Sequence, residues 1–214
     1  MMLKLRVDNQ EIETREGKTL LQACLDNRIY IPNLCYLEDM ESPSASCRMC
    51  FVEIEGIKQP VPSCTVQVRD EMVVKTDTPG VRQLQRTALR LLLSVHDVDC
   101  KNCHANKNCE LQNIAKFLKV GLKPKRLERY LKETQIDETH PFLNHYPNRC
   151  VLCGKCVHIC RGKHGQSVLT FAKRGFDTVI STYSVTDVSS LACSDCGTYV
   201  KACPVGALAL KESS

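Results

Sequence analysis

The sequence has no tryptophan, few aromatic residues and no long apolar run. Of its 214 residues, 43% are hydrophobic and 5% aromatic, which suffices for cores of modest size. The most apolar stretch, residues 88–95, is short and contains Arg90. A membrane-spanning helix needs about 20 apolar residues. We therefore expect no direct membrane insertion.

Catalytic fingerprints are missing as well. The ten glycines include no Gly-x-Gly pair, so the nicotinamide and flavin fingerprint is absent. No P-loop and no Ser/His/Asp arrangement stands out. We expect no catalytic residue, no substrate-converting site and no cofactor-binding residue beyond metal ligands.

Cysteine, in contrast, is abundant, with fifteen residues. A disulfide-stapled secreted protein would begin with a leader, but the chain turns charged at once with Lys4 and Arg6. We expect a cytoplasmic protein, in which clustered cysteines indicate metal sites. The net charge of +5 counts these cysteines as neutral, although metal-bound cysteines are thiolates. The charge therefore gives no evidence for a nucleic-acid partner, and we expect none.

The first part of the chain predicts a β-grasp-like order. Alternating residues 1–8 and Ile12 with Thr14 predict a hairpin. Thr19 predicts the cap of a helix over 20–27. Strands are expected at 51–55 and 72–75.

Two helical segments and a late strand pair follow. A helix over 81–95 is expected to bury one apolar stripe, and a shorter helix lies around 109–120. Strands are expected at 167–172 and 177–182. The fold class is α+β, with this division: a β-grasp domain at 1–78, a small helical domain at 79–122, a linker at 123–146, and a third domain at 147–214. The expected stripe on the long helix consists of Leu84, Ala88, Leu91, Leu92 and Val95.

The first cysteine site has the spacing Cys35-x11-Cys47-x2-Cys50-x13-Cys64. Four thiolates hold a [2Fe–2S] cluster. The small, polar residues 42–46 would let backbone amides approach the cluster sulfurs. Structural zinc is the alternative, but the long first spacing and the β-grasp context favour iron and sulfide.

The second site is His96-x3-Cys100-x2-Cys103-x5-Cys109, where the long helix is expected to end. His96 and Cys100 are adjacent if that helix persists for one more turn. The three cysteines otherwise lack a fourth partner, so we predict a [4Fe–4S] cluster with one histidine ligand. His104 is the rival ligand.

The third site begins with Cys150-x2-Cys153-x2-Cys156-x3-Cys160, the bacterial ferredoxin spacing. In that pattern the fourth cysteine of the run serves a second cluster. Cys150, Cys153 and Cys156 would therefore combine with the distant Cys203 to hold a complete [4Fe–4S] cluster. The three sites thus predict a [2Fe–2S] β-grasp domain at 1–78, a His-ligated [4Fe–4S] domain at 79–122 and a ferredoxin-like [4Fe–4S] domain at 147–214.

The second half of that pattern is defective. Cys160, Cys193 and Cys196 remain, but Tyr199 stands where a third cysteine of the second motif is expected. The outcomes left open are a [4Fe–4S] cluster with another ligand, such as Asp195 or water, a [3Fe–4S] cluster, or no cluster. The remaining cysteine, Cys24, is predicted to be a small core residue.

These motifs together resemble the N-terminal part of the large iron–sulfur subunit of NADH:quinone oxidoreductase. They also resemble the short diaphorase subunits of NAD-reducing hydrogenases. Further matching stretches are 31–36, 46–50, 150–156 and 203–208. Since the chain stops at Ser214, without a molybdopterin-like domain, the short hydrogenase type is expected.

The resemblance implies a subunit that passes single electrons between a flavin/NAD(H)-binding subunit and a catalytic redox subunit, within a hetero-oligomer. Its cofactors would be one [2Fe–2S] and two [4Fe–4S] clusters, with a further [4Fe–4S] or [3Fe–4S] cluster open. A free-standing polyferredoxin is the principal alternative. The N-terminal region of an iron-only hydrogenase and a zinc-stabilised interaction module are further alternatives.

Overall fold

The computed structural model describes residues 1–123, 127–133, 135–140, 142–164, 169–182 and 196–211, without the side chains of 163, 164, 182 and 196. The chain forms two compact units. The first comprises Met1–Arg90 with Phe117–Val120, and the second comprises Leu91–Lys116 with Gly121–Ser214. The division into four segments predicted above stays a prediction.

The first unit is built on a five-stranded sheet of order β2-β1-β5-β3-β4. β1 and β5 are parallel, and the other neighbours are antiparallel. The predicted hairpin is present as β1 and β2, and only the short β4 was missed. The strands are β1 (Met2–Val7), β2 (Gln10–Arg15), β3 (Phe51–Ile54), β4 (Val61–Pro62) and β5 (Met72–Lys75).

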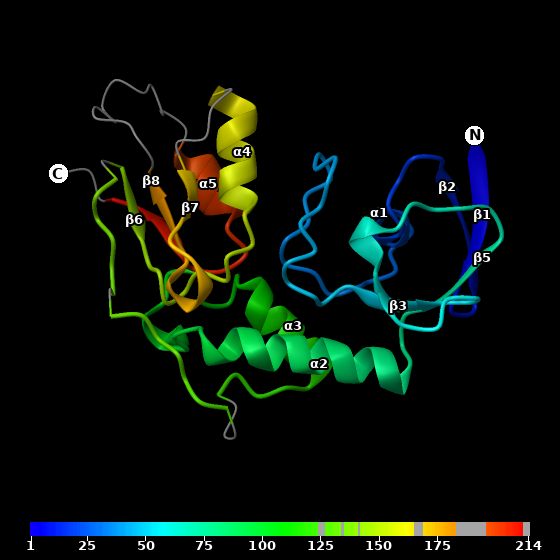
Figure 1. Cartoon of the computed structure of the whole chain (residues 1–214), viewed down its shortest axis with the longest axis horizontal. Coiled ribbons are helices and arrows are strands. Elements are labelled where there is room, and N and C mark those ends of the chain that lie inside the picture. The colour runs from blue at the N-terminus through cyan, green and yellow to red at the C-terminus, as the bar shows by residue number, and fades with distance from the viewer. Residues whose placement is uncertain (124–126, 134, 141, 165–168, 183–195, 212–214) are drawn as a thin grey trace. The chain divides into compact units, whose positions relative to one another are not determined.

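Helix α1 (Leu20–Asp26) covers one face of this sheet (Figure 1). The Thr19 side chain accepts a hydrogen bond from the Gln22 N–H at 3.2 Å, which confirms the predicted cap. Leu20 and Leu21 of the helix meet Leu5 and Val7 of β1 in a closed apolar core. This core fixes the loops that carry the first four site cysteines.

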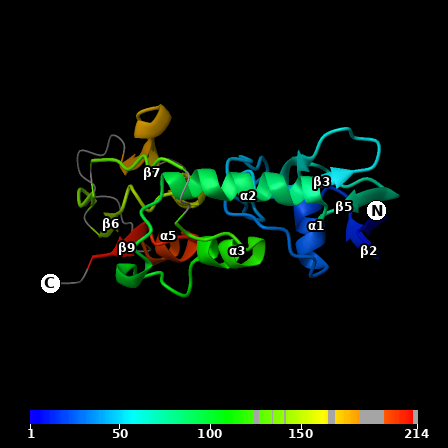
Figure 2. The same cartoon turned by 90° about the horizontal axis from the view of Figure 1, so that it is seen from below.

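Helix α2 (Pro79–Ser94) is one uninterrupted helix (Figure 2), but the predicted stripe was wrong. Leu84 and Leu91 are exposed. The buried side chains lie every four residues at Val81, Gln85, Leu89 and Leu93. Gln85 is the polar residue on this buried face. It can be buried because its side-chain amide donates a hydrogen bond to the Phe51 carbonyl at 3.2 Å.

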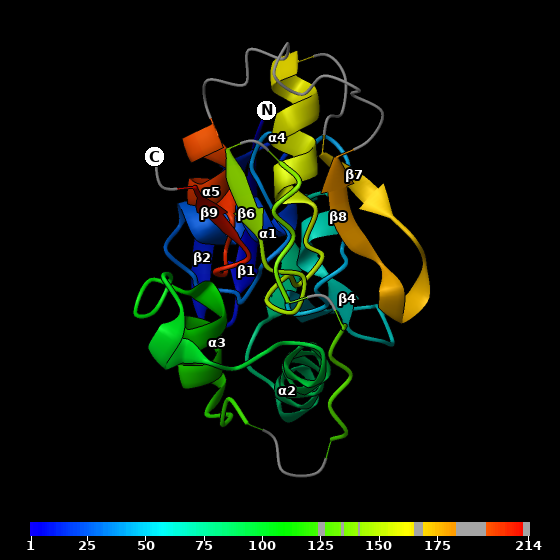
Figure 3. The same ribbon diagram turned by 90° about the vertical axis from the view of Figure 1, so that its left-hand side faces the viewer.

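The later part of the second unit contains two helices and two short β-pairs. Helix α4 packs against β7 and α5, and α5 packs against β9 (Figure 3). β6 pairs with β9, and β7 with β8, both antiparallel. Its elements are β6 (Leu143–His145), α4 (Lys155–His164), β7 (Leu169–Ala172), β8 (Val179–Thr182), α5 (Cys196–Ala202) and β9 (Leu208–Leu210), with the 3-10 helix η3 at Gly175–Asp177.

The β6–β9 pair and both helices escaped prediction. β6 and β9 have three residues each, too few for a periodic pattern, and they lie more than 60 positions apart. The cysteine-rich sequence of α4 carries no clear apolar stripe. Helix α3 (Glu110–Leu118), in contrast, was expected. No helix in the described ranges is both long and apolar enough to cross a bilayer.

Candidate iron–sulfur centres

The first four site cysteines converge at one end of the β-grasp core. Cys35, Cys47, Cys50 and Cys64 are all at most 5% exposed, and Cys64 lies in the 3-10 helix η1 (Ser63–Thr65). Cys47 hydrogen bonds to Cys35, which lowers the pKa of Cys35 and raises that of Cys47. The same exchange between Cys64 and Cys50 lowers the pKa of Cys50. The four sulfurs therefore form two contacting pairs.

Serine hydroxyls surround this thiol group. Ser44 and Ser46 hydrogen bond to the Cys35 sulfur and lower its pKa further, whereas the Ser63 hydroxyl donates to the Cys50 carbonyl at 2.8 Å. The sequence had suggested backbone amides from residues 42–46, and the structure adds their side chains. Such donors stabilise negative charge on sulfur, as a bound cluster requires.

The loop at this site has an unusual backbone. Ala45 and Arg48 adopt left-handed conformations, with φ of 49° and 54°. Non-glycine residues rarely do so, and such strain concentrates at binding sites. Where a left-handed residue follows a right-handed one, successive backbone N–H groups point toward one spot and form an anion-binding concavity. The loops of the other two sites contain Lys107 (φ 70°) and Leu152 (φ 51°).

The second group of cysteines lies on the loop between α2 and α3. Cys100 begins the 3-10 helix η2 (Cys100–Asn102), and Cys109 immediately precedes α3. Burial raises the pKa of Cys109, and nearby Cys103 and Cys100 raise it further, so the three sulfurs are neighbours. The N–H groups of Leu111 and Gln112 at the start of α3 hydrogen bond to the Cys109 sulfur and oppose that rise.

His96 does not share a helix with Cys100, because α2 ends at Ser94. The condition under which His96 and Cys100 would be adjacent on one helix is therefore not met. His96 is nevertheless 8% exposed, its Nδ1 has no hydrogen-bond partner, and burial lowers its pKa to about 4. The rival His104 has a ring nitrogen 3.0 Å from the Leu208 carbonyl oxygen. His96 is thus a neutral, buried imidazole whose Nδ1 is unpartnered while its other nitrogen hydrogen bonds to the backbone of Arg149, the arrangement typical of a metal-ligating histidine.

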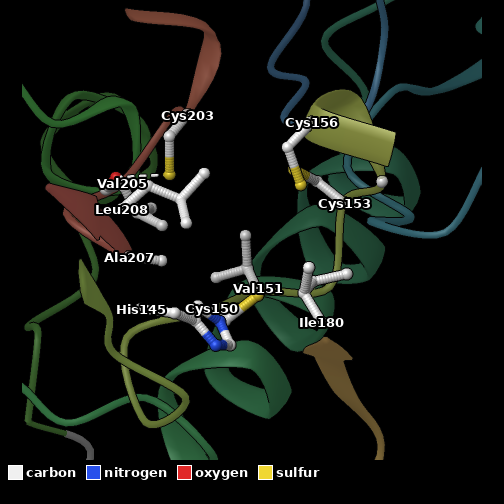
Figure 4. A pocket seen from close by; sticks show the side chains of 11 residues that line it. His145, Cys150, Val151, Cys153, Cys156, Ile180, Cys203, Val205, Ala207 and Leu208 are labelled. Carbon is white, nitrogen blue, oxygen red and sulfur yellow. Dashed lines mark hydrogen bonds between the residues drawn. The ribbon is translucent and has the colours of Figure 1, made fainter. Parts of the chain in front are cut away.

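The third group lines one pocket of the second unit (Figure 4). Cys150, Cys153 and Cys156 come from the start of α4 and the loop before it, and Cys203 directly follows α5. The structure thus brings together four cysteines separated by up to 53 positions. The remaining lining residues are His145, Val151, Gly154, Ile180, Val205, Ala207 and Leu208.

Backbone amides surround these sulfurs. Burial raises the pKa of Cys150 to about 12, and a hydrogen bond to the backbone of Leu152 opposes the rise. Burial also raises the pKa of Cys203, where the backbone groups of Val205, Ala207 and Leu208 oppose it. A dry pocket with thiols and inward amides fits an anionic iron–sulfur cluster, because cluster charge and sulfur–amide hydrogen bonds offset the cost of burying thiolates.

The doubtful second half of the ferredoxin pattern looks different. Cys160 is 1% exposed, and its sulfur accepts a hydrogen bond from the Leu169 N–H at 3.4 Å. Tyr199 is also 1% exposed and packs in the same core cluster. Cys193 and Asp195 lie outside the described residues, as does the side chain of Cys196.

Cys24 stands apart from all these groups. It is fully buried in the core of the first unit, and burial raises its pKa to about 12. This confirms its prediction as a small core residue. Among the described residues no group of three or more Cys, His, Asp or Glu side chains closes around a point as single-ion ligands do. The four ligands of a [4Fe–4S] cluster bind four different iron atoms and so enclose a volume.

A β-grasp unit with four paired thiols, followed by a ferredoxin-like unit with two further cysteine sites, defines an iron–sulfur electron-transfer protein. Three family descriptions match in the same order. Residues 1–79 match the 2Fe-2S iron-sulfur cluster binding domain, and residues 85–122 match the NADH-ubiquinone oxidoreductase-G iron-sulfur binding region. Residues 140–209 match the ferredoxin-like domain of NADH-quinone oxidoreductase subunit 3.

The proteins that this chain resembles include subunits of NADH-quinone oxidoreductase and of an NADP-reducing hydrogenase, as the sequence motifs predicted. The chain is 35% identical over 207 residues to a subunit of NADH-quinone oxidoreductase from Rhizobium meliloti (strain 1021), and the match covers 97% of this chain and 24% of the relative. It is 34% identical over 218 residues to NADP-reducing hydrogenase subunit HndD of Solidesulfovibrio fructosivorans, covering 99% of this chain and 36% of the relative. The chain thus spans about a quarter to a third of these curated relatives.

A solved structure matches over a greater share of its length. A chain in the crystal structure of an NAD⁺-reducing [NiFe]-hydrogenase in the H2-reduced state superimposes with a TM-score of 0.86. It is 29% identical, and the match covers 99% of this chain and 88% of that chain. The chain therefore resembles both the large iron–sulfur subunit of NADH:quinone oxidoreductase and a subunit of NAD-reducing hydrogenase.

Proposed function

We propose that this chain is the electron-transfer subunit of a cytoplasmic, multi-subunit NAD(P)-linked oxidoreductase. It would carry single electrons between a flavin/NAD(H)-binding subunit and a catalytic redox subunit. The observation that carries this proposal is the succession of three different cysteine sites, each within its own loop system, on one chain. The match over nearly the whole chain to part of an NAD⁺-reducing hydrogenase supports the same assembly.

The proposed ligand sets follow the three groups of side chains. Cys35, Cys47, Cys50 and Cys64 hold the [2Fe–2S] cluster, and Cys150, Cys153, Cys156 and Cys203 hold one [4Fe–4S] cluster. His96, Cys100, Cys103 and Cys109 hold the other [4Fe–4S] cluster. When bound, these clusters accept and release one electron at a time.

The role of the protein is to hold the clusters, to bury them and to tune their reduction potentials. Serine hydroxyls at the first site and backbone amides at the third place hydrogen bonds on ligand sulfurs. These contacts stabilise negative charge and set how readily each site takes an electron. The imidazole of His96 replaces one anionic ligand by a neutral one, which favours reduction at that site.

At the defective site we propose that Tyr199 serves as a core residue and that no fourth cluster binds. The supporting observation is its complete burial beside Cys160 in the apolar cluster of the second unit. A protonated phenol, with a pKa of about 10, is a poor iron ligand.

Purification of the tagged chain from its own cells tests the assembly. We expect a hetero-oligomer that contains bound flavin and a separate redox subunit. Recovery of a monomeric, cluster-loaded chain with no flavin-bearing neighbour would contradict the proposal and favour the free-standing polyferredoxin. Iron bound without acid-labile sulfide, or zinc in place of iron, would contradict both.

A further inference from the structure

His145 stands out in the cysteine pocket of the second unit. Apart from the four cysteines, the side chains that line this pocket are apolar, with His145 as the exception. The residue is 7% exposed, and neither of its ring nitrogens has a hydrogen-bond partner. Buried polar groups are normally paired, so two orphaned nitrogens on one ring need an explanation.

The backbone of β6 directs this ring inward. Leu143 and His145 alternate with the half-buried Asn144, so both point into the core. His145 pairs with Leu208 across β6 and β9, and its own N–H and carbonyl are satisfied by Asp137 at 2.9 and 2.7 Å. Figure 4 shows the imidazole directed from β6 toward the side of the pocket that Cys150 occupies.

His145 also lines a second cavity, together with Asp137, Thr139 and Ser181. Burial lowers the pKa of His145, and the imidazole carries at least one N–H donor in either protonation state.

We propose that His145 donates a hydrogen bond to the [4Fe–4S] cluster held by Cys150, Cys153, Cys156 and Cys203, and thereby raises its reduction potential. The acceptor is a cluster sulfide or the Cys150 sulfur. The hydrogen bond strengthens when the cluster gains an electron, because the sulfurs become more negative. His145 is thus a tuning residue outside the ligand set. This inference rests on the cluster assignment of the proposed function.

The test compares the wild type with three variants, all loaded anaerobically, by redox titration followed with electron paramagnetic resonance. His145→Leu removes the donor, and His145→Gln keeps an N–H of similar reach. His140→Leu is the matched control, because His140 is 6% exposed and lines the second cavity but not the cysteine pocket, and its Nδ1 accepts from the Phe142 N–H. The signal of this cluster is identified by its loss in Cys150→Ser.

We expect the midpoint potential of this cluster to fall in His145→Leu, to recover in part in His145→Gln, and to stay at the wild-type value in His140→Leu. The potentials of the other two clusters should not move. An unchanged midpoint in His145→Leu would overturn the inference and leave His145 as a core residue. A wild-type chain with no cluster that is sensitive to Cys150→Ser would instead overturn the cluster assignment, and this inference with it.

A second measurement covers the case in which His145→Leu fails to fold. Wild-type protein labelled with [¹⁵N]histidine is examined by pulsed electron paramagnetic resonance on the signal of this cluster. We expect a weak ¹⁵N coupling that disappears in His145→Gln. Its absence from the wild type would overturn the inference, whereas the strong coupling expected from a ligating His96 belongs to the other [4Fe–4S] signal.

Discussion

Gly206 lies directly against the sulfur of Cys103, so that a methyl group at position 206 would overlap it. The two residues belong to different cysteine sites, since Gly206 follows Cys203 by three positions. The same loops are joined where the Glu110 N–H donates to the Pro204 carbonyl at 2.9 Å. The loops that carry the second and third sites therefore touch within one compact unit, as one-electron transfer between neighbouring clusters requires.

Gly206→Ala should disturb the His96/Cys100/Cys103/Cys109 site first. The new methyl group would meet the Cys103 sulfur, the Ala105 Cβ at 3.2 Å and the His104 ring at 3.4 Å. We expect a loss of up to about four iron atoms per chain or a changed signal from that cluster. Iron analysis and low-temperature electron paramagnetic resonance measure both effects.

Gly121→Ala is the control for this change, since nothing lies within 4 Å of the added methyl group. It should retain all iron. A Gly206→Ala protein with wild-type iron content and spectra would show that the Gly206–Cys103 contact does not shape the site.

Replacement of the two candidate histidines should separate their roles. His96→Ala removes a proposed ligand, so about four iron atoms per chain should be lost or the cluster should become labile to oxygen. His104→Ala removes the contact with the Leu208 carbonyl and the ring contact with Tyr146, and should keep the cluster. Iron and sulfide analysis decides between them, and the reverse pattern would make His104 the ligand.

Tyr199 should behave as a core residue. Tyr199→Ala is expected to lower the free energy of unfolding by about 3–5 kcal/mol, because it empties a fully buried site. Tyr199→Phe should cost about 0.5–1.5 kcal/mol and leave the iron content unchanged. Denaturant unfolding gives the first quantity and metal analysis the second. Loss of iron in Tyr199→Phe would instead identify the phenol oxygen as a ligand.

Cys24 should be unreactive in the folded protein. Burial raises its pKa from an ordinary 9.0 to about 12, so the folded state favours the protonated thiol. The stability that this preference contributes is complete below pH 9 and falls as the pH rises toward 12. We expect no alkylation of Cys24 by iodoacetamide at pH 8 and full iron content in Cys24→Ala. Rapid alkylation of the native protein would contradict the buried assignment.

Cysteine spacing and local capping predicted much of this molecule. The hairpin, α1 with its Thr19 cap, and α3 follow from alternation, capping residues and a clear apolar stripe. The groups of thiols follow because ligand spacing is a property of the sequence itself. Cys24 belongs to no cysteine motif, and this predicted a core residue. Its burial confirms the prediction.

Other features depend on contacts that no local pattern contains. Gln85 is buried because the Phe51 carbonyl, 34 positions away, satisfies its amide. His145 lies opposite Leu208 in a pair of three-residue strands, so nothing near it in the sequence placed it beside Cys150. The one sequence signal for His145 is its position five residues before Cys150, the first cysteine of the third site.

Quantification of iron and acid-labile sulfide in the anaerobically purified chain, together with Mössbauer spectroscopy, tests the central claim most directly. One [2Fe–2S] and two [4Fe–4S] clusters predict about ten iron atoms and about ten sulfides per chain. The spectra should resolve one binuclear and two cubane clusters, one of them with a nitrogen-ligated iron site. Fewer than three clusters in fully loaded protein, or metal without sulfide, would contradict the description of this chain as a three-cluster electron carrier.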